Sequence, residues 1–321
     1  MPNYQGVWSL STQYQDAATW QYDNNPSGGS KAFTTLNQQT TNGVQYINIA
    51  TTGNSLTWGS IIYASIWDAG CGSSTRGIVR HGTTNGVGGA ANYTKIEYFT
   101  LASQGQTGAD FGNATVAASF IGGLSNSTRG VFAGGDNSSG NEINTMDYIT
   151  IASTANATDF GDLSAANKEL SGTASPTRGL FSGGRVGSTR INRIEYITIA
   201  STSNTSDFGD LTVARYSPGS LCNGTRAVFG GGNDGENTNV IDYVTIASTS
   251  NATDFGDLTV AKYGASGTCD SVRGVFFGGN SGLTDIDYIT ITTTGNANDF
   301  GDLNIGAATN AATSDAHGGL S

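Results

Sequence analysis

The residues best suited to chemistry in this chain are paired aspartates that recur within one tetrapeptide, Asp-Phe-Gly-Asp. Such pairs could bind Ca²⁺, which prefers several oxygen ligands, or form ion pairs with a repeated arginine. They could also shape a turn by accepting backbone N–H groups around the glycine. A catalytic pair normally occurs once, so we interpret these copies as structural, with Ca²⁺ as the alternative. The pairs are Asp159 and Asp162, Asp207 and Asp210, Asp254 and Asp257, and Asp299 and Asp302, while Asp110 is followed by Asn113.

Histidines and cysteines offer little support for metal or nucleophilic chemistry. His81 and His317 are the only histidines, and no Ser/His/Asp arrangement can be read from the sequence. Cys71, Cys222 and Cys269 lie four or five residues before repeated arginines, without Cys-x-x-Cys spacing. We therefore predict buried free thiols, with a metal or disulfide as the alternative, and no cofactor. The sequence predicts a protein that is not an enzyme.

These residues belong to a repeat. The clearest copy runs from Thr225 to Ala261, and the repeated arginines are separated by 53, 49, 48 and 47 residues, with His317 in the equivalent place 44 residues later. A period in this range indicates a repeat architecture, in which residues present in every copy mark structure. The arginines are Arg76, Arg129, Arg178, Arg226 and Arg273.

Each copy contains four strand signals. They are a run of small residues, an apolar run ending in Gly-Gly, an alternating segment such as IDYVTIA, and the Asp-Phe-Gly-Asp segment after a turn rich in Ser, Thr and Asn. We interpret recurrent sequons such as Asn156-Ala-Thr as turn residues. Four strands in about 50 residues describe a propeller blade, whose faces are buried only when blades stack in a ring. The small first strand suits the innermost position.

The order of Arg, Gly-Gly, Tyr and an aromatic residue resembles the kelch repeat. The matching residues of one copy are Arg226, Gly231, Gly232, Tyr243 and Phe255, although kelch repeats usually carry Trp in the last position. The resemblance covers residues 45–321 and implies an all-β propeller, but no particular function. We predict six four-stranded blades, or seven if residues 18–23 form strands, with the C-terminal strands completing a blade begun near residues 45–60. HGGLS at the C-terminus aligns with a second strand.

The net charge of −11 argues against nucleic acid as a partner, because phosphate binding needs clustered Lys and Arg. No run of 18 apolar residues is present, so we expect no membrane span. The first residues also lack the basic and apolar regions of a signal peptide.

Residues 1–44 differ from the repeats because they are rich in aromatic residues, Gln and Asn. Their sequence NYQGVWSLSTQYQ resembles the opening of virion structural proteins of tailed phages, including marine phages and cyanophages. The resemblance implies a docking segment that binds other virion proteins, with synthesis in the bacterial cytoplasm and a final place in the virion. Candidate docking residues are Tyr4, Trp8, Tyr14 and Trp20.

Alternating strand directions place the second-to-third loops and the fourth-to-first connections on one face of the ring. The second-to-third loops vary most between copies, so we expect them to carry specificity. The leading hypothesis is a non-enzymatic tail, fibre or capsid-attached protein of a tailed phage that contacts a host glycan or receptor. The alternatives are a bacterial kelch-type carbohydrate- or protein-binding module and, third, a propeller enzyme acting on polysaccharide. Candidate contact residues are Asn137, Asn141, Arg185, Arg190, Asn233, Asp234 and Asn280.

Overall fold

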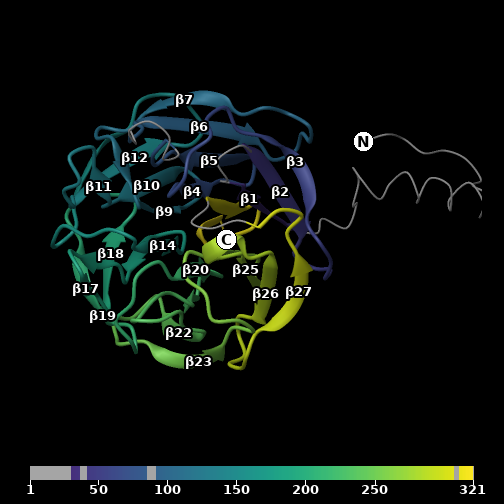
Figure 1. Cartoon of the computed structure of the whole chain (residues 1–321). Coiled ribbons are helices and arrows are strands. Elements are labelled where there is room, and N and C mark those ends of the chain that lie inside the picture. The colour runs from purple at the N-terminus through teal and green to yellow at the C-terminus, as the bar shows by residue number, and fades with distance from the viewer. Residues whose placement is uncertain (1–29, 37–41, 85–91, 307–310, 321) are drawn as a thin grey trace, which may run out of the picture.

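The computed structural model describes residues 30–36, 42–84, 92–306 and 311–320, which form six four-stranded antiparallel sheets around a central axis (Figure 1). The predicted all-β propeller with six blades is confirmed. The innermost strands of neighbouring blades contact one another around the whole ring.

The blades are numbered along the chain, and their strands are given from the axis outward. Blade one is β28 (Ala312–Ser314), β1 (Lys31–Thr35), β2 (Gly43–Asn48) and β3 (Leu56–Ser60). Blade two is β4 (Ala69–Gly72), β5 (Arg76–Arg80), β6 (Lys95–Thr100) and β7 (Ala109–Asn113). Blade three is β9 (Gly122–Ser125), β10 (Arg129–Ala133), β12 (Thr145–Thr150) and β13 (Thr158–Asp162).

The second half of the ring repeats this order. Blade four is β14 (Ser171–Ala174), β15 (Arg178–Ser182), β18 (Arg193–Thr198) and β19 (Ser206–Asp210). Blade five is β20 (Gly219–Cys222), β21 (Arg226–Gly230), β22 (Val240–Thr245) and β23 (Thr253–Asp257). Blade six is β24 (Ser266–Cys269), β25 (Arg273–Phe277), β26 (Asp285–Thr290) and β27 (Asn298–Asp302).

Short elements decorate the blades. β8 (Ala118–Ser119) pairs with β11 (Asp136–Asn137), and β16 (Arg185–Val186) pairs with β17 (Thr189–Arg190). Two 3-10 turns are η1 (Asn280–Gly282) and η2 (Gly318–Leu320).

The ring is closed by a strand from each end of the described chain. β28 pairs with β1, with Phe33 opposite Thr313. The prediction that the C-terminus completes the first blade is therefore correct, but a single strand does so, and it takes the innermost position. Two details of the prediction were wrong. The segment after His317 forms the turn η2 (Gly318–Leu320) and no second strand, and Lys31 of β1 occupies the arginine position of this blade.

The first blade begins at Lys31, so the expected boundary at residue 44 falls inside β2. Lys31 lies with its ammonium group 5.5 Å from the ring centre of Tyr46, as the repeated arginines lie over their own tyrosines. A lysine in place of arginine, and a blade split between two parts of the chain, concealed this copy from the repeat pattern.

The hydrophobic core consists of six separate clusters, and each lies between two neighbouring blades. Between blades five and six, for example, Val228 and Phe255 pack against Phe276 and Ile289. Each blade therefore buries its apolar faces only against its neighbours, as expected for stacked repeats. The stability of any one blade depends on the closed ring.

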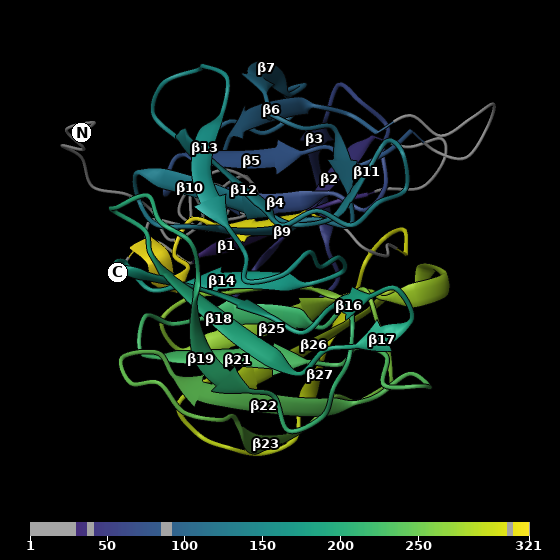
Figure 2. The same cartoon turned by 90° about the vertical axis from the view of Figure 1, so that its left-hand side faces the viewer.

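The two faces of the ring are distinct. Lys168 in a fourth-to-first connection bonds Asp136 in a second-to-third loop at 2.8 Å, so both kinds of segment share one face, as predicted. We call this the loop face. Figure 2 shows the ring on edge, with β11, β16 and β17 on this face and the C-terminal end on the other. We call that other side the opposite face.

Truncation tests the closure. A chain ending at Gly306 lacks β28, so β1 loses its inner partner, keeps only β2, and exposes the inner edge of blade one. We expect a large fall in melting temperature and a broader transition. A chain ending at Asp315 keeps β28 and loses only η2 and His317, so it serves as the control and should melt well above the chain ending at Gly306. Equal melting of the two truncated chains would contradict the structural role of β28.

Candidate functional site

The repeated arginines join five of the six blades to the next one. The Nη1 atom of Arg226 in blade five donates to the carbonyl oxygen of Ile291 in blade six at 2.9 Å, while its guanidinium lies 4.3 Å from the ring centre of Tyr243. The contact recurs with bonds of 2.7–2.9 Å, and Arg273 closes the ring onto Ile49. The arginines thus bind a tyrosine ring and a carbonyl instead of the aspartates with which pairing was considered.

The Asp-Phe-Gly-Asp segments form a second contact between blades. Gly256 has a φ of +143°, and an added Cβ would lie 2.5 Å from the backbone of Gly295 in the next blade. Beside it, the backbone N–H of Asp257 donates to the side-chain oxygen of Asn296 at 3.1 Å. The asparagine of the third-to-fourth turn makes this bond in five copies, as Asn54, Asn156, Asn204, Asn251 and Asn296.

The repeated aspartates therefore lie at the contacts between blades. The sequon asparagines belong to the same contacts, because they accept hydrogen bonds from the aspartate backbone. Within the described residues, no group of three or more His, Cys, Asp or Glu side chains could hold a metal ion.

A third contact was not recognised from the sequence. The third strand of each blade carries a buried acid or amide, which accepts hydrogen bonds from the segment that follows the outer strand of the preceding blade. In blade five, Asp242 accepts from the backbone N–H of Thr212 at 3.1 Å and from its hydroxyl at 2.5 Å. The six residues are Gln45, Glu97, Asp147, Glu195, Asp242 and Asp287.

Cations are buried beside several of these acids. Arg215 lies 3.0 Å from Asp242, and Lys262 in the equivalent position lies 2.8 Å from Asp287. Burial lowers the pKa of Arg215, and the charge of Asp242 opposes that effect. Both pairs are sealed from solvent at the blade contact, so they are not available to a substrate.

Paired substitutions test this role. Removing one partner leaves an uncompensated buried charge, so we expect Arg215→Met or Asp242→Asn alone to lower the free energy of unfolding by about 3 kcal/mol. The double variant should lose clearly less than the sum of the two losses, as measured by urea denaturation. Lys262→Met with Asp287→Asn is the matched pair in blade six. Additive losses in both pairs would show that the charges are not coupled.

Blade two contains a Ser-His-acid cluster that the sequence did not reveal. His81 Nδ1 lies 2.6 Å from the hydroxyl of Ser65, and its Nε2 lies 2.8 Å from Glu97. Asp68 accepts from the Ser65 hydroxyl at 3.0 Å and from the backbone of Gly82 at 2.8 Å. The side chain of His81 has no exposed surface. This cluster takes the place of the ion pairs in other blades, and a substrate cannot reach its serine.

The three cysteines lie on innermost strands as buried free thiols. Burial raises the pKa of Cys71 and Cys222 far above the usual range, and raises that of Cys269 to about 12. Cys269 donates to the carbonyl oxygen of Cys222 in the neighbouring blade at 2.8 Å. Such protonated thiols behave as small packing residues.

A cavity of about 120 Å³ opens at the loop-face end of the central channel. Its rim includes the residue two positions before the innermost strand in blades two to six, namely Trp67, Phe120, Glu169, Ser217 and Gly264. These residues are linked from blade to blade: the backbone N–H of Phe120 donates to Trp67, Glu169 to Phe120, Ser217 to Glu169 and Gly264 to Ser217, over 2.7–3.2 Å. We call these five residues the collar.

All five collar residues have a left-handed backbone conformation. Trp67, Phe120, Glu169 and Ser217 have φ values of 59°, 61°, 58° and 49°, and Gly264 has 68°. This left-handed region costs a residue with a side chain about 1 kcal/mol, and glycine very little. The chain has 47 glycines, yet places only one of them in the described collar. Side chains are therefore present at these positions despite an energetic cost.

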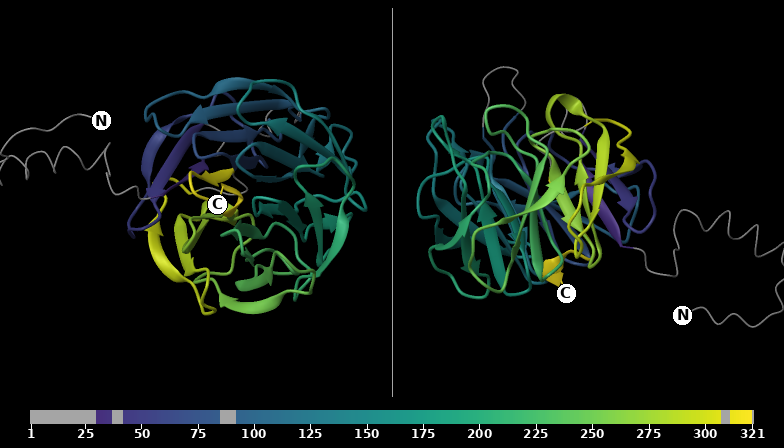
Figure 3. Two further views of the ribbon diagram at one scale, coloured as in Figure 1. Left: turned by 180° about the vertical axis from the view of Figure 1, so that it is seen from behind. Right: turned by 90° about the horizontal axis from the view of Figure 1, so that it is seen from below.

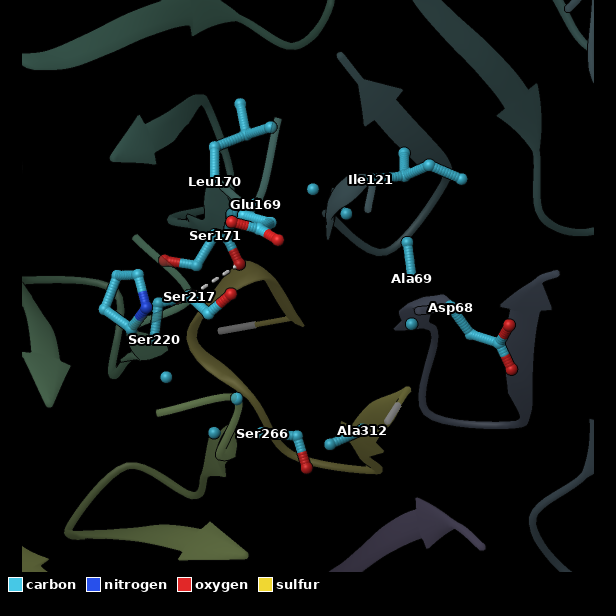
Figure 4. A pocket seen from close by; sticks show the side chains of 18 of the residues that line it. Asp68, Ala69, Ile121, Glu169, Leu170, Ser171, Ser217, Ser220, Ser266 and Ala312 are labelled. Carbon is cyan, nitrogen blue, oxygen red and sulfur yellow. Dashed lines mark hydrogen bonds between the residues drawn. The ribbon is translucent and has the colours of Figure 1, made fainter. Parts of the chain in front are cut away.

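The side chains around the cavity fall into two groups. Trp67 and Phe120 stack at 3.9 Å between ring centres, and both are partly exposed. On the blades that follow, Glu169 binds Arg185 through two guanidinium nitrogens, with an Nη2–Oε1 distance of 3.0 Å. Figure 4 shows hydroxyl groups near the same space, whereas the carboxylate of Asp68 points away from it. The lining hydroxyl residues are Ser171, Ser217, Ser220 and Ser266.

The other end of the channel is covered by η2. An added Cβ on Gly318 would lie 2.1 Å from the carbonyl oxygen of Cys222, and one on Gly319 would lie 2.0 Å from that of Ser125, so the turn contacts two blades closely. His317 bonds the carbonyl of Gly72 in a third blade. Face-on views place this end of the chain in the middle of the ring (Figures 1 and 3). A ligand of the cavity must therefore enter from the loop face.

Acid should loosen this cover. Burial lowers the pKa of His317 to about 4, from an ordinary value of 6.5. The unfolded chain then binds the proton more tightly than the folded chain, so stability falls as the pH drops from 6.5 towards 4. We expect His317 to account for about 2 kcal/mol of this fall, allowing for its partial exposure. The measurement is unfolding of the wild type and of His317→Gln at several pH values. Parallel pH curves would contradict the assignment.

The predicted contact residues lie on the loop face, but most have structural bonds there. Asn137 caps its own loop, with its side chain accepting from Ser139 at 2.9 Å and from Asn141 at 3.1 Å. Arg190 bonds Asn233 at 3.2 Å, and Asn280 accepts from the backbone of Tyr263 at 3.3 Å.

Two more of these residues have local partners. Asp234 accepts from the backbone of Glu236 at 3.4 Å, and the guanidinium of Arg185 lies 5.2 Å from the ring centre of Tyr216. The loop face was thus located correctly, but the collar at its centre was not recognised. Tyr4, Trp8, Tyr14 and Trp20 lie outside the described residues.

The described residues include no helix with the length and apolar character that a membrane span requires. No protein-family model matches the chain, and no curated protein matches it either.

Proposed function

We propose that this chain is a non-enzymatic recognition propeller carried by a larger particle, as a tail, fibre or capsid-attached protein of a tailed phage. The observation that supports this most is the separation of the two faces. The cavity and the variable loops lie on the loop face, whereas the chain enters blade one at the opposite face. There, the carbonyl oxygen of Ser30 accepts from the backbone of Ile49, next to the Arg273 contact.

This polarity suits attachment at one face and recognition at the other. Residues 1–29 precede the point of entry, and they contain the aromatic residues and the sequence that resembles phage virion proteins. A segment that binds the particle from this side would leave the loop face directed outward. The residue order of the repeat supports a kelch-type origin of the ring.

The described acids and nucleophiles support a binding role over catalysis. The buried acids of the third strands, the Ser65–His81–Glu97 cluster and the three thiols are enclosed in the blades. At the cavity, Glu169 is already neutralised by Arg185. These groups support contacts between blades and leave the partly exposed aromatic rings and the hydroxyl of Ser217 for binding.

The second candidate is a carbohydrate- or protein-binding module without a particle, and the aromatic pair at the cavity is equally compatible with it. The two candidates differ in what residues 1–29 do. They make the same prediction for the ring itself.

Deletion of residues 1–29 distinguishes them. Because β1 begins at Lys31, the shortened chain should fold and melt like the full chain. If the proposal is correct, antibodies against the ring will label purified particles of the source phage, and particles made with the shortened chain will lack the protein. Normal incorporation of the shortened chain would refute a docking role, and absence of the full chain from particles would favour the second candidate.

A further inference from the structure

We infer that the collar binds the terminal pyranose residue of a neutral glycan at the loop-face cavity. This inference deepens the proposed function, because it names the ligand of the recognition face. It depends on the ring alone, so it can be tested without a particle.

The first argument is the contrast between backbone and side chains in the collar. The N–H to carbonyl bonds between neighbouring collar residues are repeated from blade to blade, and they impose a left-handed conformation on each one. Glycine would satisfy those bonds without strain. The collar instead carries Trp, Phe, Glu and Ser, which differ in chemistry although the surrounding repeats are alike. Side chains are kept at these strained positions, and they differ from blade to blade. Both facts indicate that they are selected for the groups that they contact.

The second argument is the chemistry of the cavity. A pyranose has one face of C–H groups and a rim of hydroxyl groups, so its site needs an apolar plate beside hydrogen-bonding groups. Trp67 and Phe120 form a parallel stack in which each ring has one face turned away from the other. Ser217 and Ser171 supply partly exposed hydroxyl groups across the cavity from blade two. However, Ser171 also bonds Ser182 at 3.1 Å, and the buried hydroxyl of Ser220 donates to the carbonyl of Gly172 at 2.9 Å. An apolar wall with a few placed polar groups is characteristic of small-ligand sites.

The third argument concerns charge and access. The carboxylate of Glu169 is paired with Arg185, and that of Asp68 accepts bonds from Ser65 and Gly82 away from the cavity. Neither side of the cavity therefore offers an unpaired charge from these two acids, which favours a neutral sugar. Because η2 covers the far end of the channel, a chain cannot pass through it. The site accepts an end of the glycan.

Two glycine substitutions in the collar test the role of the aromatic rings. Trp67→Gly with Phe120→Gly removes both rings while it relieves the left-handed strain, and the backbone bonds of the collar remain possible. Glycine relieves the backbone strain but loses the packing of two partly buried rings, so we expect a moderate fall in melting temperature with a cooperative transition retained. The full chain should bind neutral glycans on an array, and the double variant should bind at least about tenfold more weakly in calorimetric titration.

Two more variants locate the ligand. Trp67→Phe keeps the stack and should keep binding within a few-fold. In the chain that lacks residues 1–29, and with them Trp8 and Trp20, the same substitution should abolish the saccharide-induced change in tryptophan fluorescence, because the remaining Trp58 is buried. Val272→Ala, on an exposed turn of the opposite face, is the control and should bind like the wild type. If the glycine variant does not fold, the loss of the fluorescence change in Trp67→Phe decides the question.

Several results would overturn the inference. They are no binding to any glycan on the array, equal binding by the folded glycine variant, or a fluorescence change that persists in Trp67→Phe. A preference for acidic glycans would also contradict it. None of these results bears on whether residues 1–29 attach the protein to a particle, so the inference can fail while the proposed function stands.

Discussion

A polar side chain in the middle of every third strand accepts hydrogen bonds from the blade before it, and this contact fixes how the blades meet. Five of the six residues are acids, and the sixth is Gln45. A buried carboxylate must be paired and hydrogen-bonded to be tolerated. That requirement explains the buried Arg215 and Lys262, and it explains why His81 stands beside Glu97. Where the acid is replaced by uncharged Gln45, the hydroxyl of Ser55 and the backbone of Asn304 bind it instead.

The same constraint accounts for the resemblance between copies. Each blade presents one surface to the blade before it and another to the blade after it, so a residue at either surface has an equivalent partner all around the ring. The arginine on Tyr243, the glycine at 256 and the asparagine at 296 are repeated for this reason. Residues that face the channel or the loop face have no such partner and are free to differ. Similarity between copies therefore separates the framework of this protein from its recognition surface.

The architecture could be predicted because five copies of the repeat are recognisable in the sequence. The site could not be predicted in this way. Strand order, blade number and the two faces follow from the alternation and from the spacing of the arginines. Lys31 and β28 escaped notice because the first blade is divided between distant segments and has lost its arginine. The collar could not be predicted, because a left-handed backbone position is normally recognised in a sequence by a glycine. Among the described collar residues, only Gly264 is a glycine. The signal of the collar was present in the aligned copies as a single position that reads Trp, Phe, Glu, Ser and Gly. Similarly, Ser65, His81 and Glu97 come together only because their strands and connections are neighbours in the fold.

The partnership of β1 with β28 sets the order of events during synthesis. β1 leaves the ribosome before the other strands of the described ring, and its inner edge stays unpaired until β28 has been made. An unpaired edge is a template for pairing with other chains. The growing polypeptide is thus exposed to association with its neighbours while blades two to six are synthesised, and closure requires β28 to enter a nearly complete ring. Slow translation or crowding of nascent chains would then favour strand exchange between copies, in which β28 of one molecule completes blade one of another.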